Sequence, residues 1–126
     1  MELVTIVVML ALIEYFIFSL RVGMARGTYD IPAPRTSGHE TFDRLYRVQM
    51  NTSEQLLLFI PAMFAFGFYV HPTAAAGLGV LFIAGRAVYA RGYVADPAGR
   101  GVGFMMGMLA NAILVIGAII GAARQL

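Results

Sequence analysis

The chain has 126 residues, of which 60% are hydrophobic and only 13% are charged, and its formal net charge is +2. Soluble domains carry about 25% charged residues, so this composition excludes a disordered chain, a nucleic-acid-binding tail and an ordinary soluble enzyme. Cysteine is absent, which excludes a disulfide framework, a thiolate metal site and a cysteine nucleophile.

Most of the charged residues fall in two segments that separate long apolar stretches. Residues 3–20 carry one charge, Glu14, and residues 55–85 and 101–123 carry none. The middle stretch is too long for one membrane span of about 20 residues, and His71-Pro72-Thr73 divides it. We therefore predict one domain over residues 1–126. It is expected to be an all-α, integral membrane four-helix bundle, with helices near 2–26, 42–70, 73–94 and 99–123.

Arginines mark two of the three predicted connections, and the chain has no lysine. The connection between the second and third helices has no arginine. The positive-inside rule then places both arginine-rich connections in the cytoplasm and both termini outside. Exclusive use of arginine and the small size favour a bacterial inner membrane. The arginines concerned are Arg21, Arg26, Arg35, Arg44 and Arg47 in the first connection, and Arg86, Arg91 and Arg100 in the last.

A polar stripe runs along the second predicted helix. Its members, at spacings of 3, 4 and 3, are Arg44, Arg47, Asn51 and Glu54. Such spacings place side chains on one helical face. Arginines alone could reach the lipid headgroups, but Asn51 and Glu54 lie deeper, where polar side chains usually face protein or a cavity. Tyr89 and Tyr93 share a face of the third helix with Arg86.

These side chains suit a small anionic peptide that carries a free amine. Arginines bind carboxylates with two hydrogen bonds, Glu54 can hold an ammonium group, and Asn51 can meet a peptide amide. If the peptide also carried a thiol, Arg100 could stabilise the thiolate, because a nearby cation lowers the pKa of a thiol. Arg100 opens the fourth predicted helix, so the positive end of the helix dipole would assist it.

Two motifs give the chain a resemblance to the MAPEG family. Residues 42–54 read FDRLYRVQMNTSE, which is similar to that family's second-helix signature, F-E-R-x-x-R-x-Q-x-N-x-x-E. Arg86-x-x-Tyr89-x-x-Gly92-Tyr93, followed by Arg100, is the second match. The resemblance covers nearly the whole chain and is strongest to the branch with leukotriene C4 synthase and microsomal glutathione transferase 2.

The resemblance implies a homotrimer in the bilayer, with glutathione as co-substrate between neighbouring subunits and no metal. The implied activity is a glutathione transferase acting on hydrophobic electrophiles, with peroxidase activity as a second reaction. Gly27 and Gln55 depart from the branch, since an arginine and a tyrosine are expected there. Arg100 matches the thiol-activating arginine, and the residues implied to bind glutathione are Arg26, Arg47, Gln49, Asn51, Glu54, Tyr89 and Tyr93.

Other readings stay open at this point. A scaffold could bind lipophilic ligands or glutathione without chemistry. A small proton-coupled exporter of cationic drugs could use an acid such as Glu14, because intramembrane carboxylates are costly and usually functional. Gly103-x-x-x-Gly107 and Gly117-x-x-x-Gly121 predict close helix packing that agrees with oligomerisation. His39 is expected in a loop.

Overall fold

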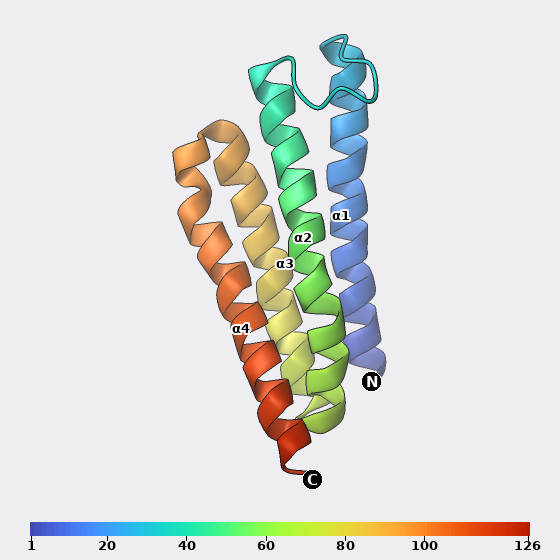
Figure 1. The fold of residues 1–126 in the computed structure, drawn as a ribbon, viewed down its shortest axis with the longest axis vertical. Helices are drawn as coiled ribbons and strands as arrows, with labels where there is room; N and C mark the ends of the chain where they lie inside the picture. Colours follow the sequence, from blue (N-terminus) through green and yellow to red (C-terminus); the bar gives the residue numbers. More distant parts are fainter.

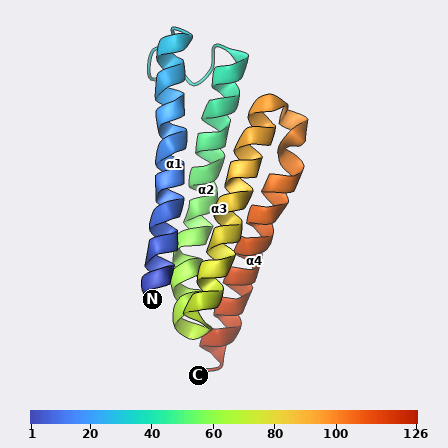
Figure 2. The ribbon, with the colours of Figure 1, turned by 180° about the vertical axis from the view of Figure 1, so that it is seen from behind.

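The computed structural model describes residues 1–126, and all of its regular structure is helical. The elements are α1 (Glu2–Thr28), α2 (Glu40–Tyr69), α3 (Pro72–Ala95), a 3-10 helix η1 (Pro97–Arg100) and α4 (Gly101–Ala123). The long helices run up and down side by side (Figures 1 and 2). Both termini and the α2–α3 turn lie at one end, called here the terminal end. The α1–α2 loop and η1 lie toward the other, the loop end. The predicted all-α four-helix bundle is confirmed.

Histidine side chains cap the starts of α2 and α3. The backbone N–H of Thr41 donates to His39 Nδ1 at 3.1 Å, and that of Ala74 donates to His71 Nδ1 at 3.3 Å. The first N–H groups of a helix lack partners within it, so a side-chain acceptor stabilises the start. His39 lies in the loop before α2, as predicted, and its side chain also caps that helix. Its cap starts α2 at Glu40, two residues before the predicted start.

Three helical segments are long and apolar enough to cross a membrane: Glu2–Thr28, Pro72–Ala95 and Pro97–Ala123. α2 is not among them, because its first half carries the polar stripe. The outer faces of the apolar helices display large side chains, such as Phe16 on α1 at 62% exposed and Ile119 on α4 at 64% exposed. An outer surface of this kind belongs in the lipid bilayer, and the chain is an integral membrane protein.

The core at the terminal end is entirely apolar. The rings of Phe59 on α2 and Phe82 on α3 stack with centroids 4.0 Å apart. Val8 on α1 and Leu114 on α4 are fully buried in the same cluster. All four helices therefore contribute to this core.

Glycines let α4 approach its neighbours closely. A Cβ atom on Gly85 of α3 would lie 2.9 Å from the backbone nitrogen of Gly107, and one on Gly121 would lie 2.8 Å from Val70 Cγ2. Gly117 contacts the Phe66 ring in the same way. The predicted glycine pairs thus pack α4 against α2 and α3 of its own chain, and this packing accounts for them without a second subunit.

Candidate functional site

A cleft of about 380 Å³ lies between α2, α3 and α4 toward the loop end. Two arginines, two tyrosines, an asparagine and one phenylalanine line it. This is a cationic and hydrogen-bonding surface in a bundle whose outer faces are largely apolar. The lining residues are Arg47, Asn51, Tyr89, Tyr93, Arg100 and Phe104.

α2 contributes Arg47 and Asn51, one helical turn apart. Asn51 is only 7% exposed, and its Oδ1 atom is buried without a hydrogen-bond partner. Leaving a buried amide oxygen unpaired costs about 1–3 kcal/mol, so buried polar atoms are nearly always paired. The unpaired oxygen therefore marks a place where a ligand N–H group could bind. Arg47 Nη1 contacts Glu54 Oε1 at 3.2 Å, and both side chains are about half exposed.

α3 contributes two tyrosines whose rings stack at a centroid distance of 5.7 Å with an interplanar angle of 9°. Tyr89 is buried and Tyr93 is partly exposed. The spacing of four residues puts both rings on one face of α3. The pair gives the cleft a flat aromatic wall with two hydroxyl groups.

Arg100 enters the cleft from the tight turn between α3 and α4. Asp96 accepts a hydrogen bond from the backbone N–H of Ala98 at 3.1 Å, which starts η1. Gly92 and Gly99 pack backbone to backbone: a Cβ atom on Gly99 would lie 3.1 Å from the Gly92 oxygen. The turn is therefore tightly held. Arg100 is the last residue of η1 and directly precedes α4, next to the positive end of that helix's dipole.

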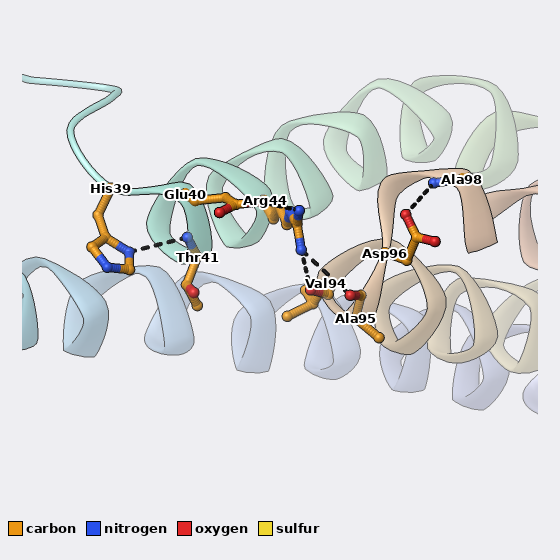
Figure 3. A network of polar contacts seen from close by, with 8 residues as sticks. All are labelled: His39, Glu40, Thr41, Arg44, Val94, Ala95, Asp96 and Ala98. Atoms are coloured by element: carbon orange, nitrogen blue, oxygen red, sulfur yellow. Dashed lines mark hydrogen bonds and ion pairs between the residues drawn. The ribbon is translucent and has the colours of Figure 1, made fainter.

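Arg44 ties α2 to this turn. Its Nη1 donates to the backbone oxygens of Val94 at 3.1 Å and Ala95 at 3.4 Å, and it pairs with Glu40 on its own helix. Figure 3 shows Arg44 reaching from α2 to the end of α3, beside the turn that Asp96 starts. The last carbonyls of a helix lack partners within it, and a cation is favourable there. Arg44 therefore stabilises the turn that borders the cleft and does not itself line the cleft.

The structure does not bring every predicted binding residue into this cleft. Gln49 Nε2 donates to Ser19 Oγ on α1 at 3.0 Å. Arg26 Nη1 donates to the backbone oxygen of Arg35 at 2.6 Å, and its guanidinium lies over the Phe42 ring. Gln49 is two residues from Asn51, about 200° around the helix, so it faces α1. Glu54 does not line the cleft but is joined to it through Arg47.

Two contributions were missing from the sequence prediction. Phe104 lines the cleft one turn after Arg100, a spacing of four residues that could have identified it. Arg86 is 1% exposed and lies beneath the Tyr89 ring. Its place on the tyrosine face was expected, but its burial was not. No group of three or more His, Asp or Glu side chains is placed to hold a metal ion.

Comparison with known proteins gives a consistent picture. The sequence profile of the MAPEG family matches residues 4–120. An uncharacterized protein of Synechocystis is 44% identical over 117 residues, which cover 93% of this chain and 85% of that protein. Bovine microsomal glutathione S-transferase 2 is 34% identical over 81% of this chain and 70% of its own length. Rat leukotriene C4 synthase is 36% identical over 72% of this chain and 61% of its own length.

Proposed function

The chain belongs to the MAPEG family, and from this premise we propose that it is a membrane-bound glutathione transferase. It would join glutathione to hydrophobic electrophiles, or use glutathione to reduce lipid peroxides. The observation that carries the proposal is the unpaired, buried Asn51 oxygen in a cleft that also holds Arg47 and Arg100. The similar leukotriene C4 synthase and microsomal glutathione S-transferase 2 support the choice of ligand.

Glutathione matches the cleft group by group. It has two carboxylates, and Arg47 can bind one of them through paired hydrogen bonds. Its peptide N–H groups can donate to Asn51 Oδ1, and the tyrosine hydroxyls can bind its carbonyls. Its ammonium group needs an anion, and Glu54 stands beside Arg47.

Arg100 would hold the glutathione sulfur as a thiolate, because a cation next to a thiol lowers its pKa. In conjugation the sulfur forms a bond to the electrophilic carbon. The electron pair of the broken bond leaves with the leaving group or on the opened oxygen, which takes a proton from water. In peroxide reduction the thiolate attacks the terminal peroxide oxygen and the O–O bond breaks. The sulfur becomes a sulfenic acid, and the alkoxide leaves and takes a proton from water to give the alcohol. The thiol of a second glutathione then attacks the sulfenic sulfur and displaces water, which gives the disulfide. Proximity and thiolate stabilisation supply the rate.

The homotrimer remains part of the proposal. Arg26 and Gln49 do not line the cleft of a single chain. Both would approach glutathione from a neighbouring subunit, so that glutathione binds between two copies of the chain. Co-expressing an Arg100→Ala subunit with a Gln49→Ala subunit tests this arrangement. Mixed trimers with some activity above both pure variants support a shared site, and strictly additive activity contradicts it. The arginine-rich loop end would face the cytoplasm of a bacterial inner membrane.

An ultraviolet difference titration of the detergent-solubilised protein with glutathione tests the function. We expect a saturable thiolate absorbance at neutral pH. S-methylglutathione is the control ligand, because it can occupy the site but cannot ionise. Binding without the thiolate signal would favour a scaffold and remove the role of Arg100. No binding at all would overturn the proposal. The proton-coupled exporter that uses Glu14 would then be the leading alternative.

A further inference from the structure

Arg86 carries a charge into the interior of the bundle without a carboxylate in direct contact. It is the largest fully buried side chain, and no ion pair within 4.0 Å includes it. Its Nε and Nη2 atoms donate to Thr52 Oγ1 at 3.2 and 2.8 Å. A buried cation is costly in a membrane protein, and such residues usually face the bundle interior and serve a function.

Thr52 gives the guanidinium a fixed anchor on α2. Its hydroxyl donates to the backbone oxygen of Val48 at 2.7 Å, so its lone pairs are free to accept both N–H groups of Arg86. Thr52 directly follows Asn51, the residue with the unpaired oxygen in the cleft. The position of Arg86 is therefore coupled to the part of α2 that faces the ligand.

The other side of Arg86 contacts the aromatic wall. The guanidinium carbon lies 4.2 Å from the Tyr89 ring centroid, which is a cation–π contact. Tyr89 in turn stacks on Tyr93. On its backbone side, Tyr89 abuts Gly103 of α4, where no Cβ atom would fit. The ring is thus held between a cation and the α4 backbone.

Glu14 on α1 is not part of this arrangement. No ion pair joins it to Arg86, and its Oε1 atom is buried without a hydrogen-bond partner. It lines a groove whose other lining residues are aliphatic. Thr52 and the Tyr89 ring are therefore the groups that hold the guanidinium.

We propose that Arg86 is a positioning residue of the glutathione cleft, which holds the Tyr89 ring and the Thr52 hydroxyl in one geometry. This inference rests on the proposed function, because the cleft it orders is the glutathione cleft. Arg86 itself does not line the cleft.

Arg86→Lys tests the geometry, because lysine keeps the charge but loses the planar two-donor fork. We expect the Kd for glutathione to rise about ten-fold, the effect of losing one charge-assisted hydrogen bond. The matched control is Arg91→Lys, an exposed arginine on the same helix, which should leave the Kd unchanged. An unchanged Kd in Arg86→Lys would overturn the positioning role.

Arg86→Met separates positioning from folding, because it removes the buried charge and keeps an unbranched apolar side chain. The melting temperature should stay equal or rise, while the Kd for glutathione rises about ten-fold. A Kd equal to the parent value in this folded variant would overturn the positioning role.

Tyrosine absorption keeps the test independent of glutathione binding. The chain has six tyrosines and no tryptophan, so the near-ultraviolet spectrum reports on tyrosine surroundings. If the parent protein fails to bind glutathione, the proposed function fails, yet Arg86→Lys should still change this spectrum and Arg91→Lys should not. Identical spectra for the parent and Arg86→Lys would overturn the Arg86 role in that case.

Discussion

The two ends of the bundle use the same helices for opposite purposes. At the terminal end, α2 and α3 meet through the stacked rings of Phe59 and Phe82, which belong to a cluster of buried hydrophobic side chains. At the loop end, the same two helices meet through Thr52 and Arg86. An apolar contact needs only shape, whereas a polar contact needs every partner in place. The terminal end can therefore fix the fold while the loop end is shaped for a ligand.

Because the two ends differ in this way, mutations at each end should affect different properties of the protein. Changes at the loop end should weaken chemistry or binding and leave the fold intact. Changes at the terminal end should lower stability and leave the affinity of the folded protein unchanged. The four predictions below test this division, from the largest expected effect to the smallest.

Arg100→Ala should give the largest effect. Removing a group that stabilises developing negative charge lowers kcat by about 100- to 1,000-fold, and the conjugation rate with a hydrophobic electrophile measures it. Glutathione binding should largely survive, because the cleft keeps its other donors. Arg124→Ala, at the terminal end, is the control and should keep full activity. Equal losses of binding and turnover in Arg100→Ala would contradict the thiolate role.

Phe82→Ala should be the most destabilising change at the terminal end. It removes the ring that stacks on Phe59 and leaves a cavity. We expect the free energy of unfolding to fall by about 2–3 kcal/mol, toward the low end for such truncations, because lipid is as apolar as the core. Reversible denaturation in mixed micelles measures it. The glutathione Kd of the remaining folded protein should match the parent, and a raised Kd would break the division between the ends.

Asn51→Leu should change affinity and stability in opposite senses. The variant removes a buried oxygen without a partner, so the melting temperature should stay equal or rise. The Kd for glutathione should increase about ten-fold, since the ligand loses one hydrogen bond inside a protected site. Calorimetric titration and thermal unfolding measure the two quantities. A lowered melting temperature with unchanged Kd would mean that the asparagine serves the fold.

Arg44→Met should give the smallest effect. It removes the link from α2 to the last carbonyls of α3 and so loosens the turn that presents Arg100. Turnover should fall about three-fold, in keeping with the loss of one partly exposed polar interaction, while the Kd for glutathione stays constant. Steady-state kinetics separate the two. The control is Arg21→Met, because Arg21 is exposed on α1. An equal loss of turnover in both variants would contradict a role of Arg44 in holding the turn that presents Arg100.

Charge distribution was sufficient to predict the fold of the chain. The uncharged stretches and the His71-Pro72-Thr73 break predict four helices, and the spacing of Arg47 and Asn51 predicts that they share a face. That spacing does not say which neighbouring helix the face meets, because tertiary packing decides it. Gln49 shows the difference: the family motif groups it with Asn51, while helical geometry turns it toward Ser19.

Burial was the property that the sequence revealed least. Arg86 and Arg91 lie five residues apart on α3, yet the first is enclosed and the second exposed. Hydropathy treats them alike, and only the arrangement of α1, α2 and α4 around α3 separates them. His39 lies in the loop as predicted, but its capping role was not predicted, because imidazole is a less familiar helix cap than serine or aspartate.

The close glycine contacts of α4 give its two faces different tolerance of substitution. The inner face, which packs against α2 and α3, tolerates little change, and the outer face tolerates more. Any side chain at Gly103 would push α4 away from α3 and carry Arg100 with it, because a Cβ atom there would clash with the Tyr89 backbone nitrogen. Met105 and Met108 lie on the outer face of α4 and are largely exposed. Substitutions there can accumulate without disturbing the fold. New preferences for hydrophobic substrates are therefore expected to evolve on the outer side of α4, while its inner side stays unchanged across diverging copies of the gene.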